Sequence, residues 1–163
     1  MGIHPSPSFF IREIHLPNMS LPELPIGLAL LICDTLIEDM RTKKKSLIGL
    51  FSQITAKKFP YIHPSMTLFI SMTGAKGGFK CTLTCEREED GESVITVPCN
   101  METGSPRDVA DLVVSLRSMR FTKPGRYMFR VLVDGVPVMM RPLNVVERRG
   151  ATSEPQEPGE NAF

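Results

Sequence analysis

Histidine 63 is the residue of this sequence best suited to acid–base chemistry, because an imidazole titrates near neutral pH. It is the only one of the three histidines inside the predicted domain, where it lies in the segment FPYIHP. A metal site would need further ligands, and a catalytic triad would need an orienting carboxylate and a nucleophile. Neither a G-x-S-x-G nor an H-E-x-x-H motif is present. We therefore interpret His63 as a loop residue that hydrogen-bonds to the backbone, and a hydrolase using His63 with acidic residues as the least favoured alternative.

Asp34 interrupts the longest apolar run of the sequence. A buried carboxylate is costly unless it is paired or hydrogen-bonded. One interpretation joins Asp34, Glu38 and Asp39 into a carboxylate cluster for a cation or a general base, although strand alternation places Asp39 on the opposite face. The favoured interpretation is a structural ion pair between Asp34 and an arginine such as Arg130 or Arg141.

No spacing typical of a cofactor or metal site is present. Cys33, Cys81, Cys85 and Cys99 lack the C-x-x-C pairs of zinc sites. Cys81 and Cys85 fall on one predicted strand, too far apart for a disulfide, so we expect reduced, buried thiols. The segment Gly74–Gly78 lacks the spacing of a phosphate-binding loop and reads as a linker between strands. The sequence therefore predicts no catalytic residue, no metal and no cofactor.

The balance of charge argues against a nucleic-acid or membrane partner. Lys plus Arg number 19 against 18 for Asp plus Glu, which gives a net charge of +1. The basic segment Arg41–Lys45 lacks the interleaved aromatic residues of a nucleic-acid site, so we interpret it as a solvated hairpin tip. No apolar run reaches the roughly 20 residues of a membrane span, and the N-terminal residues lack a basic region followed by an apolar core. We predict a cytoplasmic protein.

The elements that must position these residues are strands. Alternating apolar residues recur between turn signals such as Asp134–Gly135, and no sustained helical periodicity is present. A short helix over Arg107–Leu116 is a less favoured alternative to a strand there. We predict an all-β, immunoglobulin-like antiparallel β-sandwich at residues 26–147, after a Pro-rich N-terminal extension at 1–25 and before a disordered C-terminal tail at 148–163. About eight strands are expected: Gly27–Glu38, Ser46–Ala56, Met66–Thr73, Phe79–Glu86, Val94–Cys99, Val109–Phe121, Arg126–Asp134 and Val136–Val146.

Two sets of motifs carry a resemblance to known domains. The segment PGRYMFRV at 124–131 resembles the penultimate strand of immunoglobulin-like modules, which implies that Tyr127 is a structural residue forming a tyrosine corner. A further set of motifs resembles an uncharacterised family of small bacterial proteins classed only as a domain of unknown function. That resemblance implies a compact bacterial domain and no activity; its motifs are LICD at 31–34, IED at 37–39, KSLIG at 45–49, FP at 59–60 and HP at 63–64.

These observations favour a non-catalytic interaction or structural module over an enzyme. The expected partner is another protein or a second copy of the chain, and the alternative is a domain that binds a small ligand or a carbohydrate. Alternation from Val138 and Met140, taken as core residues, places Met139 on the outer face with Arg141. We therefore predict a symmetric homodimer with Met139 in its interface.

Overall fold

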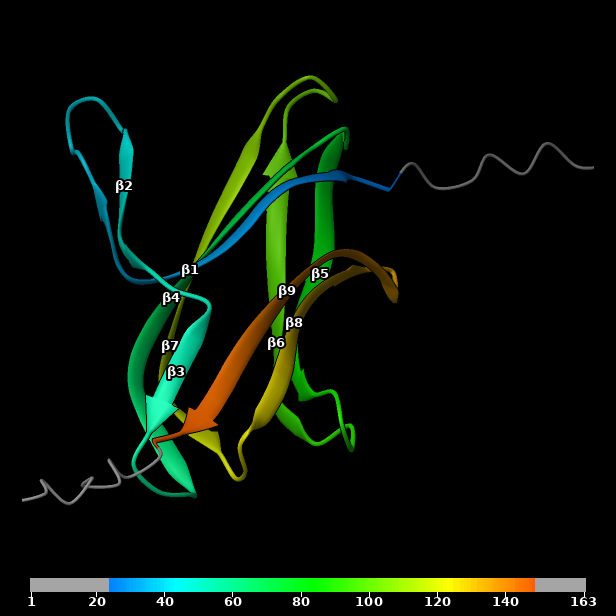
Figure 1. The fold of residues 1–163 in the computed structure, drawn as a ribbon. Coiled ribbons are helices and arrows are strands. Elements are labelled where there is room, and N and C mark those ends of the chain that lie inside the picture. Colours follow the sequence, from blue (N-terminus) through cyan, green and yellow to red (C-terminus); the bar gives the residue numbers. More distant parts are fainter. Residues whose placement is uncertain (1–23, 149–163) are drawn as a thin grey trace, which may run out of the picture.

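The computed structural model describes residues 24–148 as two β-sheets packed face to face (Figure 1). One sheet has the strand order β2-β1-β4-β7 and the other has the order β3-β9-β8-β5-β6. These residues contain no helix, so the predicted all-β sandwich is confirmed, with nine strands in place of about eight. The strands are β1 (Ile26–Glu38), β2 (Lys45–Leu50), β3 (Gln53–Ala56), β4 (Tyr61–Thr73), β5 (Gly77–Arg87), β6 (Ser93–Thr103), β7 (Ala110–Phe121), β8 (Gly125–Val133) and β9 (Val136–Glu147).

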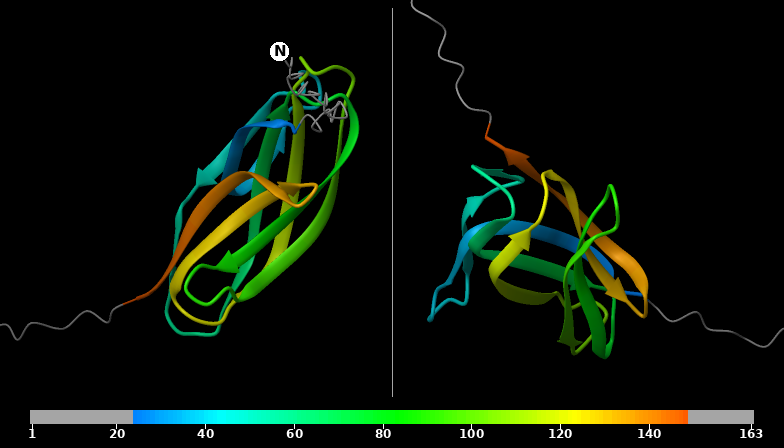
Figure 2. Two further views of the ribbon diagram at one scale, coloured as in Figure 1. Left: turned by 90° about the vertical axis from the view of Figure 1, so that its right-hand side faces the viewer. Right: turned by 90° about the horizontal axis from the view of Figure 1, so that it is seen from below.

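Figure 2 shows the two layers from two further directions. Apolar side chains at alternate strand positions fill the space between them. In β5, for example, Cys81, Leu83 and Cys85 are buried while Lys80 is exposed. Fully burying one large apolar side chain contributes about 1.5–3 kcal/mol to folding, so this core dominates the stability of the domain. The largest fully buried side chains include Tyr127, Phe121, Phe129, Ile32, Met66 and Leu68.

The strand predicted over Ser46–Ala56 is in fact two strands in different sheets. β2 pairs with β1, whereas β3 pairs in parallel with β9. Gly49 adopts a φ of 67°, and the backbone N–H of Phe51 donates to the carbonyl of Ile32 at 3.1 Å. These two features turn the chain out of one sheet and into the other, which the apolar pattern of the sequence does not indicate.

β1 changes its main partner halfway along its length. Its first part, up to Cys33, pairs with β4, and the part from Cys33 to Glu38 pairs with β2. Residues 34–50, which we call the β1–β2 hairpin, project from the sandwich (Figure 1, cyan). At the hairpin tip, Asp39 Oδ1 accepts hydrogen bonds from the backbone N–H groups of Thr42 and Arg41 at 2.6 Å and 3.0 Å. Hydrogen bonds from Thr42 are the main cause of the lowered pKa of Asp39.

The region from Arg107 to Leu116 does not form a helix. β7 occupies residues 110–121 and pairs with β4 along its whole length. The β-branched residues Val113 and Val114 suit this extended geometry. Within residues 24–148, no helical segment has the length and apolarity that a membrane crossing requires.

The described strands run from Ile26 to Glu147, and Leu24 also packs against the core. Residues 1–23 and 149–163 lie outside the described residues. The predicted N-terminal extension and the predicted C-terminal tail fall almost entirely on these two segments.

Candidate functional site

A hollow of about 350 Å³ lies at the base of the β1–β2 hairpin, where the chain passes from one sheet to the other. It contains Asp34 and His63, the two residues that the sequence singles out for acid–base chemistry. We call it the Asp34 hollow. It is lined by Asp34, Gly49, Leu50, Phe51, Gln53, Ile54, Thr55, Tyr61 and His63.

The carboxylate of Asp34 packs directly over Gly49, its neighbour on the adjacent strand. A Cβ atom at position 49 would overlap the carboxylate, and the positive φ of Gly49 also disfavours any other residue there. The hairpin fold therefore holds Asp34 at the rim of the hollow, where the residue is exposed.

The predicted ion pair of Asp34 with Arg130 or Arg141 is wrong. Arg130 pairs with Glu86 at 2.8 Å in the other sheet, and no salt bridge within residues 24–148 involves Asp34 or Arg141. Because the hairpin carries Asp34 to the surface, its carboxylate is hydrated and needs no arginine partner.

The alternative carboxylate cluster does not form either. Glu38 pairs with Lys43 at 3.5 Å, and Asp39 binds the backbone of the hairpin tip. Among the described residues, no group of three or more His, Cys, Asp or Glu side chains could hold a metal ion. Asp34 thus contributes a single negative charge to the hollow.

His63 lies within strand β4 and is not the loop residue that its flanking prolines suggest. Its Nδ1 atom lies 3.5 Å from the hydroxyl oxygen of Tyr61, and its buried Nε2 atom has no hydrogen-bond partner within the described part of the chain. Burial lowers the pKa of His63 and outweighs the opposite effects of the Ser65 backbone and the Asp34 carboxylate. The imidazole is therefore neutral at pH 7.

Two aromatic rings that sequence reasoning missed accompany His63. The ring centroid of Phe51 lies 5.8 Å from that of His63, and the ring of Tyr61 lies 6.1 Å away, both in tilted arrangements. The hydrogen-bonding neighbour of the imidazole is thus a tyrosine and not the serine or cysteine of a nucleophilic triad. The arrangement of a carboxylate, a neutral imidazole and two rings is suited to binding.

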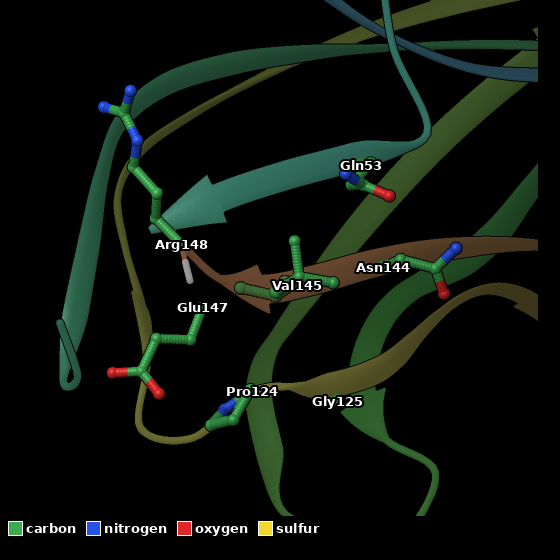
Figure 3. A pocket seen from close by; sticks show the side chains of 8 residues that line it. Gln53, Pro124, Gly125, Asn144, Val145, Glu147 and Arg148 are labelled. Atoms are coloured by element: carbon green, nitrogen blue, oxygen red, sulfur yellow. The ribbon is translucent and has the colours of Figure 1, made fainter. Parts of the chain in front are cut away.

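A second, larger hollow of about 880 Å³ lies beside β3, β9 and the start of β8. Figure 3 shows that the charged ends of Glu147 and Arg148 point in different directions, away from the amides of Gln53 and Asn144. No residue that the sequence singles out for chemistry lines this hollow. We therefore regard the smaller Asp34 hollow as the better candidate site.

The cysteines are free and buried, as the sequence predicts. Burial raises the pKa of Cys81 to about 11 and that of Cys85 to about 12. Such thiols are almost fully protonated at neutral pH and are poor nucleophiles.

Tyr127 forms the hydrogen bond of a tyrosine corner. Its ring is fully buried, packs edge-on against Phe121, and its hydroxyl donates to the carbonyl of Lys123 at 2.7 Å. The structural role predicted for Tyr127 therefore rests on an observed contact at the start of β8.

Met139 does not lie on the outer face, so its predicted exposure is wrong. Its side chain packs against the core over Gly27, whereas Met140 is 60% exposed. The physical reason is a bulge in the β8–β9 pairing. Val131 pairs with Met139 but Leu132 pairs with Pro137, so Val138 is an extra residue in β9. This extra residue reverses which face of the sheet the following side chains point to.

Sequence reasoning also missed an apolar surface on the β1–β2 hairpin. Ile37, Met40, Ile48 and Leu50 are all exposed. The adjacent pairs Leu36–Ile37 and Leu47–Ile48 were the available signal, because consecutive apolar residues on a strand place side chains on both of its faces.

The fold and the site together define a two-sheet β-sandwich domain with a projecting hairpin and a small aromatic hollow at its base. The chain belongs to a family of unknown function, DUF6941, whose profile matches residues 28–146. No curated protein matches the chain.

One similar solved structure is the Pseudomonas fluorescens alkylpurine DNA glycosylase AlkC bound to DNA containing an abasic site analog. It shares 13% sequence identity with a TM-score of 0.39, and the match covers 58% of this chain and 27% of that chain. This chain thus matches only about a quarter of the glycosylase, and so distant a likeness carries no argument about function.

Proposed function

We propose that this protein is a non-catalytic interaction module that binds a protein partner through its β1–β2 hairpin. The observation that carries the proposal is the apolar surface of this hairpin, where Met40 is 88% exposed, Leu50 57%, Ile37 53% and Ile48 49%. Single exposed apolar residues are common on protein surfaces. Several on one projecting element are typical of an interaction site.

The strand register groups two of these side chains on one face of the hairpin. Ile37 pairs with Ser46 and Thr35 pairs with Ile48, so the two isoleucines are diagonal neighbours. On the opposite face, the amino group of Lys45 binds the carboxylate of Asp111 on β7 at 2.9 Å. This tie orients the hairpin, and an oriented element loses less conformational entropy when it binds.

Charges at the hairpin tip indicate the chemistry of the partner. Arg41 and Lys44 are exposed beside Met40, and Lys43 lies there paired with Glu38. An apolar groove with an acidic rim would complement this surface and speed association with it. Self-association remains a second form of the same proposal, since a second copy could cover the isoleucines.

We further propose that the module works in the bacterial cytoplasm. Its four cysteines are free and buried within the sandwich, which suits a compartment that keeps thiols reduced.

A quantitative pull-down from the native host tests the hairpin. The Ile37→Ser/Ile48→Ser variant should lose specific partners that the unmodified chain captures, and the purified partner should bind this variant at least about tenfold more weakly. The matched control is Val109→Ser/Val136→Ser, which removes exposed apolar side chains elsewhere. Equal capture and equal affinity for both variants would exclude the hairpin as the binding element.

A second candidate function, small-ligand binding, is favoured by the Asp34 hollow, which gathers the rings of Phe51, Tyr61 and His63 beside the Asp34 carboxylate. Ligand sites are typically hollows lined by aromatic side chains with a few polar groups. The NMR signals of the His63 ring, followed during a ligand titration, test this candidate. Signals that stay unchanged throughout would count against it.

A further inference from the structure

The charge of the Asp34 hollow is its first distinguishing feature. Asp34 is the only charged residue among the nine that line it, because His63 is neutral at pH 7. Lys57 and Lys58 line a separate hollow that shares Thr55 and Tyr61 with this one. All three charged residues are exposed, so water screens each of them, and Asp34 is distinguished because it lines the hollow itself. An occupant of the hollow therefore lies closest to a negative charge, which favours a cation.

The rings of the hollow are its second feature. Phe51, Tyr61 and His63 form a tilted cluster with centroid distances of 5.8 Å and 6.1 Å from the imidazole. The faces of such rings attract cations that lie within about 6 Å of a centroid. Aromatic rings beside a carboxylate are typical of sites that bind organic ammonium and guanidinium groups.

The hollow thus combines a negative charge with aromatic rings. We propose that the Asp34 hollow binds a compact organic cation, with Asp34 as its counter-ion and with Phe51 and Tyr61 against its face. The volume of about 350 Å³ is at the lower end of the range for small-molecule sites, which suits a guanidinium or ammonium group on a short alkyl chain. Such a group belongs either to a free metabolite or to an arginine or lysine side chain of a protein. This proposal goes beyond the hairpin function: Leu50 belongs to both surfaces, but Ile37 and Ile48, on which the hairpin test rests, do not line the hollow.

An NMR titration of the full-length chain tests the proposal. Nα-acetylarginine methyl ester and the peptide acetyl-Gly-Arg-Gly-amide represent the two sources, and each carries the guanidinium as its only cation. The corresponding citrulline compounds replace the guanidinium with a neutral urea of similar shape. We expect the His63 ring signals to shift with arginine and the affinity for citrulline to be at least about tenfold weaker. Binding of the ester alone indicates a free small molecule, and binding of the peptide alone indicates a protein side chain. The absence of binding by both, or equal binding of citrulline, would overturn the proposal without requiring any variant.

Two substitutions then locate the cation. Asp34→Asn should weaken arginine binding about tenfold, because it removes the counter-ion and keeps the side-chain shape. Asp134→Asn is the matched control, since Asp134 is an exposed residue of the β8–β9 turn outside the hollow. An unchanged affinity in Asp34→Asn, or an equal loss in both variants, would place the cation elsewhere. The Ile37→Ser/Ile48→Ser variant should bind arginine normally, so failure of the hairpin proposal can be distinguished from failure of this one.

Discussion

The β1–β2 and β8–β9 hairpins are built from strands of the same kind but place their apolar side chains differently. β8 also pairs with β5, and β9 also pairs with β3, so the second hairpin lies inside a sheet. Tyr127, Phe129 and Val131 face the opposing sheet and are fully buried. β2 pairs with β1 alone in a hairpin that projects from the sandwich, and Ile37 and Ile48 remain exposed. Whether a hairpin lies against the opposing sheet or projects beyond it thus decides whether its apolar residues belong to the core or remain available to another molecule.

The largest expected effect is the difference in stability between a core variant and a hairpin variant. Phe129→Ala should lower the free energy of unfolding by about 3–5 kcal/mol, because it leaves a cavity between the sheets. Ile48→Ala should change it by less than about 0.5 kcal/mol, since its side chain is exposed. Urea denaturation of both variants measures the difference. A loss above about 2 kcal/mol for Ile48→Ala would show that the β1–β2 hairpin contributes to the core, contrary to the comparison.

A smaller effect is expected for the tyrosine corner of β8. Tyr127→Phe keeps the buried ring but removes the hydroxyl that binds the Lys123 carbonyl at 2.7 Å. The free energy of unfolding should fall by about 0.5–1.5 kcal/mol. Tyr61→Phe provides a comparison, because the Tyr61 hydroxyl makes only a 3.5 Å contact with His63. An unchanged urea midpoint for Tyr127→Phe would mean that the corner contributes little to stability.

Local patterns in the sequence predicted the β8–β9 hairpin well. The Asp134–Gly135 turn and the alternation of Tyr127, Phe129 and Val131 define its strands, and each of these signals lies within a few residues. The bulge at Val138 was not predictable in this way, because an extra residue in a strand depends on its pairing with the neighbouring strand. This bulge is what reversed the positions of Met139 and Met140.

The Asp34 hollow was only partly predictable for a similar reason. Asp34 and His63 stand out by type, but Phe51 reads as an ordinary apolar residue of a strand and Tyr61 falls in the segment predicted as a loop. Their meeting depends on the transfer of the chain between sheets after Gly49, a tertiary feature. The exposure of Asp34 depends on the same feature, which explains why an ion pair was expected from the sequence.

A further effect, at the base of the β1–β2 hairpin, is confined to acidic pH. Burial lowers the pKa of His63 in the folded state below its ordinary value of 6.5. The unfolded chain therefore binds a proton more readily, and stability should fall as the pH decreases below about 6.5. His63→Gln should reduce this loss between about pH 7 and pH 5.5, measured by urea denaturation at each pH. An identical pH dependence in the variant would mean that His63 keeps its ordinary pKa in the folded protein.

The smallest expected effect on stability comes from Met140, which is 60% exposed on the outer face of the β8–β9 hairpin. Met140→Lys should change the free energy of unfolding by less than about 0.5 kcal/mol. Met139→Lys should instead destabilise the domain strongly, because a charged amine would replace a side chain that packs against the core over Gly27. Equal stability of the two variants would contradict the assignment of Met139 to the inner face.

The Met140→Lys variant also tests which of the two hairpins contacts another molecule. With a net charge of only +1, long-range repulsion between copies is weak, and we expect a symmetric dimer of twice the 18.2 kDa chain mass. Light scattering coupled to size exclusion, applied to Met140→Lys and Ile48→Lys at matched concentrations, compares the two candidate faces.

If only Ile48→Lys reduces the mass to that of one chain, the β1–β2 hairpin forms the dimer and its surface is already occupied. If only Met140→Lys does so, the dimer uses the outer face of the β8–β9 hairpin and leaves the β1–β2 hairpin free for a different protein. A single-chain mass for the unmodified protein at every concentration would exclude self-association, and the exposed isoleucines would then require a different partner.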